Sequence, residues 1–585
     1  MLMAATPPPR LRVSALPFVA CWMFASLLLL AFSAATFTTR IFPDPDDALR
    51  LLQVRDWLAG QSWFDVSQHR INPPGGGDMH WSRLVDLPLA AAILLLRPLL
   101  GAAAAETAAL VLVPLLTLGV VMALVAAITH RLLDRERAIL ACLLTAVSVM
   151  AVAQLRPFRI DHHGWQLAFG LAAAWALLDP RARRGGTFAG LATATWLTIS
   201  LEGLPMAAAI AGWLSWRWLR DPHQGARLLA FVAALGGGAA VLLALTRSPG
   251  TWLAMQCDAL TAPYLGALAM AAAGTALLVA AAPASLVNRG AGLLAVAVAA
   301  GATLIGIAPA CSRGPFVALD PLVASFWYQH VAEGLPVWRQ DPAIVAHMLC
   351  LPLVGLVGCW AARRRAIGPA QVDWATLSFL LGAALAVSLL VQRGAGLANL
   401  LALPGAVFLV HAILERSRTL APLPRVAALL GAVALVMPGL PVAALVTEAA
   451  PSSARAGSAR QCVDARELRL LRALPLSTLA APLDIGPAIL IHTPHRIIAS
   501  GHHRNAAAMR DVIEIFTRAP ADARRILQRR GARYLVVCPD LIEPQLYAER
   551  NPLGLWAGLA AGRTPSWLVP VAWPGESRLQ VWRIR

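Results

Sequence analysis

The chain has 585 residues, of which 58% are hydrophobic and only 14% are charged. Such a small share of charged residues could not keep a protein of this size dispersed in water. The composition therefore excludes a soluble globular enzyme and indicates a protein embedded in lipid. A formal net charge of +18 would suggest nucleic-acid binding in a soluble protein, but here the arginines cluster at the ends of apolar segments. We therefore expect membrane lipids as partners and no nucleic acid.

Apolar stretches near the length that crosses hydrocarbon, roughly 17 to 25 residues, recur from Leu16 to Val446. They predict a helical bundle, because a spanning helix satisfies its own backbone hydrogen bonds and the alternation typical of barrel strands is absent from the sequence. The first run, Leu16 to Phe37, is long for a signal peptide, so we predict a retained first helix.

Arginine clusters separate the apolar stretches and, by the positive-inside rule, mark the cytoplasmic turns. With one helix out and one back between successive clusters, the length criterion predicts about thirteen spans, a cytoplasmic N-terminus and a C-terminus on the outer side. We expect an integral protein of a bacterial inner membrane with a periplasmic C-terminal region. The clusters are Arg10/Arg12, Arg131/Arg135/Arg137, Arg181/Arg183/Arg184, Arg217/Arg220/Arg227, Arg363/Arg364/Arg365 and Arg416/Arg418/Arg425, with a lone Arg289.

A change of character after Val446 divides the chain into two predicted domains. Residues 1–450 form the membrane domain, which includes a long outer loop at 38–86, and residues 451–585 form a small soluble α/β domain outside the membrane. The fold class is therefore mainly α. The expected strands of the second domain are Ala488–His492 and Arg533–Cys538, and the expected helices are Ala506–Phe516 and Ala521–Arg530. Cys462 and Cys538 could pair in an oxidising compartment or remain free thiols.

The first constellation of polar residues follows the first span and contains Asp44, Asp46, Asp47 and Arg50. Clustered carboxylates repel one another, and hard divalent cations such as Mg²⁺ or Mn²⁺ relieve this repulsion by accepting oxygen ligands. The alternative is a capped helix start, where Asp is favoured.

A second constellation, Asp161-His162-His163, lies in the outer turn between the third and fourth predicted spans. An Asp and a His two residues apart can reach one ion, and ionisable residues at the rim of a membrane bundle are seldom idle. The alternative is again a helix cap, with Asp161 at the start of the following helix.

Two further residues of interest lie alone in predicted outer segments, Glu333 in a long loop and Arg393 in a short turn. Glu333 is an isolated acid among apolar neighbours. Arg393 stands on the side of the membrane where the positive-inside rule disfavours arginine. A guanidinium there suits a phosphate, which it can bind bidentately, although a surface position without function is the alternative.

The order of these motifs resembles the catalytic subunit of oligosaccharyltransferases, a family of the GT-C superfamily of lipid-dependent glycosyltransferases. Asp44 to Arg50 is similar to the family's first acidic motif, Asp161-His162-His163 to its second, and Val331-Ala332-Glu333 to its loop motif ending in Glu. Arg393 falls where the family places an arginine for the lipid-linked phosphate. The segment containing Trp81 resembles the end of the family's first outer loop.

The resemblance implies a fold, a reaction and a set of site residues. It implies a divalent cation, Mg²⁺ or Mn²⁺, held by Asp44, Asp161, His163 and Glu333, with Arg393 on the phosphate of a polyprenyl-linked sugar. Asp44 would orient or deprotonate the acceptor, with Asp46 and Asp47 as alternates. Arg50, His162 and Trp81 are further candidates.

The chain departs from the family in one respect. The Trp-Trp-Asp-Tyr-Gly motif, with which the family reads a protein acceptor, is absent from residues 451–585. The acceptor thus stays open among lipid, polysaccharide and protein. The same region contains Gly501-His502-His503-Arg504-Asn505, polar enough to face a substrate, although a helix cap at Asn505 is the simpler interpretation.

Two other functions remain as alternatives to a glycosyltransferase. A transporter or flippase would place ionisable and helix-breaking residues at mid-bilayer, a pattern approached here only by Glu202 beside Gly203 and Pro205. An inactive GT-C-like scaffold would keep the fold without the activity.

Overall fold

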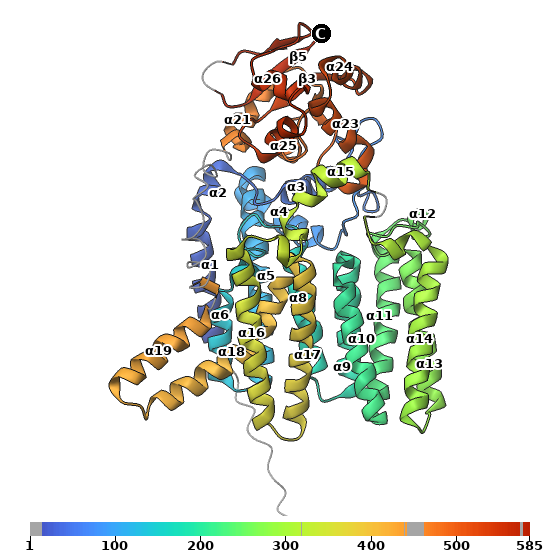
Figure 1. Cartoon of the computed structure of the whole chain (residues 1–585), viewed down its shortest axis with the longest axis vertical. Helices are drawn as coiled ribbons and strands as arrows, with labels where there is room; N and C mark the ends of the chain where they lie inside the picture. The colour runs from blue at the N-terminus through green and yellow to red at the C-terminus, as the bar shows by residue number, and fades with distance from the viewer. Residues whose placement is uncertain (1–14, 317–318, 438, 441–460, 574–576) are drawn as a thin grey trace, which may run out of the picture.

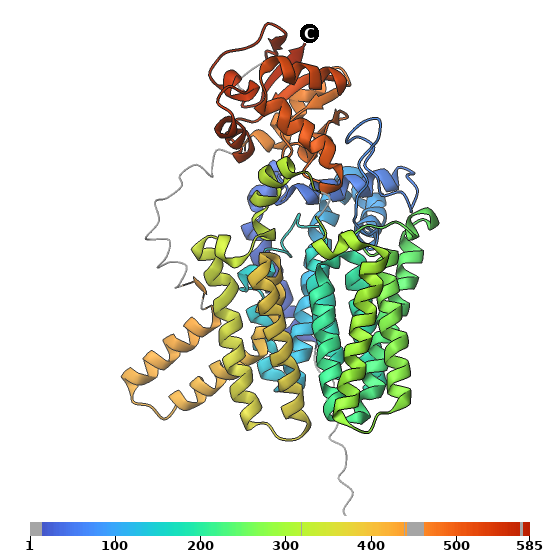
Figure 2. The same ribbon diagram turned by 45° about the vertical axis from the view of Figure 1, so that its right-hand side comes forward.

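The computed structural model describes residues 15–316, 319–437, 439–440, 461–573 and 577–585. Helices stand side by side in a bundle, and the C-terminal residues form a smaller region beyond one end of it (Figures 1 and 2). The predicted mainly α membrane protein with a small C-terminal sheet is confirmed. The Arg10/Arg12 cluster, Val446 and the predicted boundary at 450 lie outside the described residues.

Seven helical segments of the described chain are long and apolar enough to cross a bilayer. The helices concerned are α5 (Ala102–Leu132), α11 (Gly225–Thr246), α13 (Ala262–Ala281), α14 (Leu286–Ile307), α16 (Pro342–Arg365), α17 (Pro369–Leu390) and α18 (Ala395–Ser417).

Other helices of the bundle are shorter or less apolar, which is why the seven are fewer than the thirteen predicted. They contact the long helices, so the number of crossings stays a prediction. These helices are α1 (Leu16–Phe32), α4 (Asp86–Leu100), α6 (Arg135–Thr145), α8 (His163–Leu177), α9 (Ala182–Ile199) and α10 (Leu204–Arg220), whereas α19 (Pro422–Val436) projects from the side of the bundle (Figures 1 and 2).

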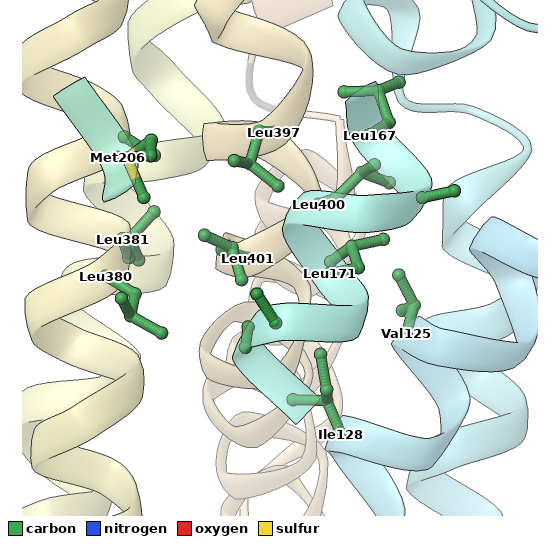
Figure 3. Close-up of a cluster of buried hydrophobic side chains, with 14 of the residues drawn as sticks. Val125, Ile128, Leu167, Leu171, Met206, Leu380, Leu381, Leu397, Leu400 and Leu401 are labelled. Carbon is green, nitrogen blue, oxygen red and sulfur yellow. The ribbon is translucent and has the colours of Figure 1, made fainter. Parts of the chain in front are cut away.

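Aliphatic side chains from five helices interlock in the middle of the bundle (Figure 3). Leucines of α8 and α18 meet there with side chains of α5, α10 and α17. Since lipid is as apolar as these residues, close packing rather than exclusion from water holds the helices together. This core positions the outer ends of α8, α10 and α18, where the polar residues gather.

Basic residues mark the end of the bundle away from the C-terminal region. Arg131 at the end of α5 lies 3.1 Å from Asp373 near the start of α17. The turn between α16 and α17, which follows the Arg363–Arg365 cluster, lies at the same end (Figure 1). This distribution agrees with cytoplasmic basic turns under the positive-inside rule.

The first outer loop lies between the bundle and the C-terminal region (Figure 1). It begins at the end of α2 (Ala34–Thr39) and contains α3 (Pro45–Leu58), and α3 contacts α22 (Gly486–His492). Asn72 donates its backbone N–H to Ile497 in the C-terminal sheet, and Ile497 donates back to Arg70. Apolar residues of the loop and of the C-terminal region share one buried cluster, so the two parts pack as one layer.

The C-terminal sheet has five strands in the order β2-β1-β3-β5-β4, of which β1 pairs in parallel with β2 and β3, whereas β5 is antiparallel to β3 and β4. The strands are β1 (Thr478–Ala480), β2 (Arg496–Ile497), β3 (Ala532–Val537), β4 (Leu568–Pro570) and β5 (Gln580–Ile584). The remaining helices are α7 (Val149–Val152), α12 (Pro249–Trp252), α15 (Pro321–Phe326), α21 (Ala465–Arg469), α23 (Ala506–Thr517), α24 (Pro520–Arg529), α25 (Ile542–Arg550) and α26 (Leu555–Ala560).

Three of the four elements predicted for this region are confirmed by β3, α23 and α24. The strand predicted at Ala488–His492 is wrong, because these residues form most of α22. A short apolar run is ambiguous between strand and helix, and Pro487 in the first turn favours the helix.

Two disulfides join outer segments. Cys462 pairs with Cys538 at the end of β3, one of the two possibilities that the sequence left open. Cys257 pairs with Cys311 and links the loops before α13 and after α14, a bond that the sequence analysis did not anticipate. Disulfides form in oxidising compartments, which fits an outer location for both loops.

Candidate active site

Asp44 stands at the start of α3 and uses its two carboxylate oxygens differently. Oδ1 accepts the backbone N–H of Asp46 at 2.9 Å and caps the helix. Oδ2 lies 3.1 Å from a guanidinium nitrogen of Arg159, a residue of the turn before α8. Asp44 therefore caps the helix with one oxygen and pairs with Arg159 through the other.

Asp161 repeats this arrangement at the start of α8. Its Oδ1 accepts the backbone N–H of His163 at 2.9 Å. Its Oδ2 lies 2.9 Å from Arg159 and 3.6 Å from the Nε2 atom of His163. Burial opposes the charged form, but Arg159 and His163 outweigh it and keep the pKa of Asp161 below its usual value.

Arg159 lies at the centre of four carboxylates from three separate segments. Its guanidinium also lies 3.4 Å from Asp47 and 3.2 Å from Glu333, and the residue is almost fully buried. We call Arg159 with Asp44, Asp47, Asp161 and Glu333 the acidic centre. Arg159 stands two residues before the second motif and was not among the predicted site residues.

The three aspartates of the first motif have different surroundings. Asp47 is fully buried and accepts the backbone N–H groups of Ile160 and Asp161 at 2.7 and 2.9 Å. Asp46 instead faces the large cavity described below. Burial, helped by the carboxylates of Asp44, Asp161 and Glu333, raises the pKa of Asp46 to about 8.

Glu333 connects the acidic centre to Arg393. Its Oε1 lies 3.5 Å from His163 Nε2 and 3.4 Å from Arg393 Nη2. Burial works to raise the pKa of Glu333, but Arg393, His163 and Arg159 hold it well below its usual range. The loop of Glu333 is fastened to the turn of Arg393, because Gln392 donates its backbone N–H to Leu335.

Glu202 completes the surroundings of Arg393. Its carboxylate pairs with Arg393 Nη1, accepts a hydrogen bond of 2.9 Å from Gln166 and lies 3.9 Å from His163 Nδ1. The sequence analysis assigned this residue only to the transporter alternative. An acid beside the break between α9 and α10, next to Gly203 and Pro205, was the available indication.

A cavity of about 1050 Å³ opens beside these residues, between the bundle, the first outer loop and the C-terminal region. The polar residues that line the cavity on this side are Asp44, Asp46, His162, His163, Glu202, Glu333 and Arg393. Apolar residues of α10, α17 and α18 cover its membrane side, among them Met206, Val387 and Leu397. The C-terminal region contributes Asp484, His492, His502, His503 and Glu543.

Three predicted candidates contribute in other ways. Arg50 is buried, pairs with Asp86 at 2.9 Å and stacks over the Trp81 ring at 4.6 Å, and neither Arg50 nor Trp81 lines the cavity. His162 does line it, and burial lowers the pKa of its imidazole well below the usual value.

Asn505 stands at the start of α23, but its side chain makes no capping hydrogen bond, contrary to the cap interpretation.

The donor atoms fit a divalent cation. The four carboxylates of Asp44, Asp161, Glu202 and Glu333 exceed the two guanidinium groups of Arg159 and Arg393, whereas burial raises the pKa of Asp47 well above its usual value. Carboxylate oxygens with one imidazole suit Mg²⁺ or, better, Mn²⁺. His162, His163 and Glu202 form a second group whose ligand atoms lie within 4.8 Å of one another.

Solved structures share this architecture. The archaeal oligosaccharyltransferase AglB from Archaeoglobus fulgidus, in complex with an inhibitory peptide and a dolichol-phosphate, matches with a TM-score of 0.68 and 13% identity over 92% of this chain and 71% of that chain. The chain has the fold of this oligosaccharyltransferase. The resemblance that the motifs indicated is thereby confirmed.

Further structures of the Archaeoglobus fulgidus oligosaccharyltransferase match as well. The one tethered with an acceptor peptide has a TM-score of 0.65 and 14% identity, over 92% of this chain and 71% of that one. The one in complex with Zn and sulfate has a TM-score of 0.55 and 13% identity, over 88% and 67%. A scan against protein-family models and a search of curated proteins found no match.

Proposed function

We propose that this chain is a membrane glycosyltransferase that moves a sugar or an oligosaccharide from a polyprenyl-phosphate or polyprenyl-pyrophosphate carrier to an acceptor at the outer face of the membrane. One observation carries the proposal: side chains from four distant segments meet at one cavity in an oligosaccharyltransferase fold. The cavity is lined by Asp44, His163, Glu333 and Arg393, and the buried carboxylate of Asp161 lies 3.6 Å from His163. The neighbour AglB, which binds a dolichol-phosphate, supports a lipid-linked donor.

The cavity offers separate surroundings for the two ends of such a donor. The polyprenyl tail would lie against the apolar side chains of α10, α17 and α18, and the phosphate would face Arg393. The guanidinium of Arg393 can bind phosphate oxygens bidentately once Glu202 or Glu333 yields one of its contacts.

A divalent cation, Mg²⁺ or Mn²⁺, would be held by Asp44, Asp161, His163 and Glu333. A neighbour that contains Zn and sulfate supports a cation together with an anion in this fold. The cation would stabilise negative charge on the departing phosphate. The carboxylates orient the reactants around it, and their burial limits competition from water.

The reaction breaks the bond between the anomeric carbon of the sugar and the carrier oxygen, and it forms a bond to the acceptor atom. The phosphate leaves with the electron pair of the broken bond. Asp44, or Asp46 beside it, accepts the acceptor's proton or orients its nucleophile. The acceptor is a lipid, a polysaccharide or a protein.

Deletion of the gene followed by complementation tests this proposal. Mass spectrometry of envelope lipids and proteins should show that the deletion strain lacks a glycan. The wild-type gene should restore this glycan, whereas Asp161→Asn and Glu333→Gln should fail to restore it. Asp341→Asn, which changes an exposed helix cap outside the cavity, serves as the control and should complement. Undiminished glycan with both site variants would instead support a scaffold, and loss from lipid but not from protein would identify the acceptor class.

A further inference from the structure

Three histidines converge where the first outer loop meets the C-terminal region. His80 belongs to the loop, and His502 and His503 precede α23. One ring nitrogen from each lies within 4.8 Å of the others, and His80 Nδ1 lies 3.0 Å from His502 Nε2. We call these residues the imidazole cluster. They line the cavity on the side of the C-terminal region.

The spacing of these nitrogens fits tetrahedral coordination. Zinc binds imidazole nitrogen at about 2.0–2.1 Å, so two ligands at the tetrahedral angle stand roughly 3.3 Å apart. The observed 3.0 Å between His80 and His502 is close to this value. Only a small side-chain adjustment would bring the third nitrogen to the same separation.

His503 has the support typical of a metal-ligating histidine. Its Nε2 lies 2.7 Å from a carboxylate oxygen of Asp258, which can only accept, so Nε2 carries the proton and Nδ1 has the free lone pair. Asp258 also pairs with Arg504, which in turn reaches Asp78, so the nearby positive charge is neutralised. Carboxylates that fix ring orientation and tautomer in this way are the usual outer partners of histidine ligands.

His502 is buried and held in a fixed position. The residue is 2% exposed, yet its Nδ1 has no hydrogen-bond partner among the described residues. The Trp81 ring packs edge-on against it at 5.6 Å and holds it in place. The ring nitrogen that faces His80 is the other one, Nε2, so Nε2 is the atom of His502 that would bind an ion.

We propose that His80, His502 and His503 bind a transition-metal ion of the Zn²⁺ type that joins the first outer loop to the C-terminal region. Three imidazoles and no carboxylate in contact with the ion select Zn²⁺ or its neighbours over Mg²⁺ and Mn²⁺. The fourth position faces the cavity and is open to water or a substrate group. This site differs in residues and metal preference from the acidic centre, and it does not depend on the proposed transferase activity.

The test uses the full chain in detergent, purified through a tag without histidine and stripped with chelator. Titration with Co²⁺ should produce the intense visible bands of tetrahedral coordination, Zn²⁺ should abolish them, and metal analysis should find one tightly bound Zn²⁺ per chain. The variants His502→Ala and His80→Ala should each lose the Co²⁺ bands and the tightly bound Zn²⁺. Asp258→Asn should weaken binding roughly 10- to 100-fold.

Two controls separate this site from the rest of the molecule. His69→Ala removes an exposed histidine of the same loop and should keep the bands. Asp161→Asn alters the acidic centre and should also keep them. Zn²⁺ should raise the unfolding midpoint of wild type but not of His80→Ala. Two results would overturn the proposal. One is the absence of tetrahedral Co²⁺ bands from the wild-type protein. The other is the presence of these bands in His80→Ala and His502→Ala variants that elute from size-exclusion chromatography as the wild type does.

Discussion

The carboxylate of Asp47 accepts the backbone N–H of Asp161 at 2.9 Å. This hydrogen bond joins the two acidic motifs, which are more than a hundred residues apart in the chain. It also explains why one aspartate of the first motif is fully buried while its neighbours face the cavity. The position of Asp161 thus depends on a residue that does not itself line the cavity.

Asp47→Ala should destabilise the outer part of the protein. The substitution leaves two buried backbone N–H groups and one contact of Arg159 unpaired, at about 2–4 kcal/mol in all. Chemical unfolding in detergent micelles measures the loss. Asp134→Ala, which removes an exposed helix cap, should lose only about 1 kcal/mol. Equal losses for the two variants would contradict a role for Asp47 in joining the motifs.

Arg159→Gln should make stability depend on a divalent cation. Without the guanidinium, four carboxylates face one another, and removing one partner of a buried ion pair destabilises by about 3–5 kcal/mol. Saturating Mn²⁺ should restore much of the lost unfolding midpoint, because the cation takes over the neutralising charge. Arg137→Gln, at a more exposed pair with Asp134, is the matched control. An Arg159→Gln variant that responds to Mn²⁺ as the control does would show that the carboxylates do not share one cation.

Glu202→Gln should weaken use of the donor without unfolding the protein. The amide keeps the size of the side chain but loses the charge that orients Arg393, and hydrogen bonds to charged groups contribute about 1.5–3 kcal/mol. We expect KM for the lipid-linked donor to rise roughly tenfold or more while kcat changes less. Arg393→Lys should behave similarly, since an ammonium cannot bind bidentately. An unchanged KM in both variants would argue against Arg393 as the phosphate ligand.

Loss of the Cys462–Cys538 disulfide should loosen the C-terminal region. The bond joins the start of the described part of this region to the end of β3, and a native disulfide contributes about 2–4 kcal/mol. Cys462→Ser with Cys538→Ser should therefore lower the unfolding midpoint and expose this region to protease. Cys21→Ser, at a free thiol in α1, is the control. Protease resistance equal to wild type would show that the apolar layer shared with the first loop suffices.

Much of the membrane fold and of the site was predictable from local patterns. Long apolar runs require helices in lipid, and β3, α23 and α24 follow from alternation and helical periodicity. Asp44, Asp161, His163, Glu333 and Arg393 were candidates because their motifs resemble those of the oligosaccharyltransferase family. Asp44 does cap its helix, as the alternative interpretation predicted, and its second carboxylate oxygen remains free of the cap and pairs with Arg159.

Tertiary structure alone decided which of these residues meet. Arg159 at the centre, Glu202 beside Arg393 and the imidazole cluster each combine side chains from distant segments, and a sequence shows spacing along the chain but not proximity in space. The strand predicted at Ala488–His492 is wrong for a local reason, since a short apolar run is ambiguous and Pro487 in the first turn favours the helix. Composition and periodicity thus determined that the protein lies in lipid and most of the helices and strands that it forms, whereas packing determined which polar side chains meet.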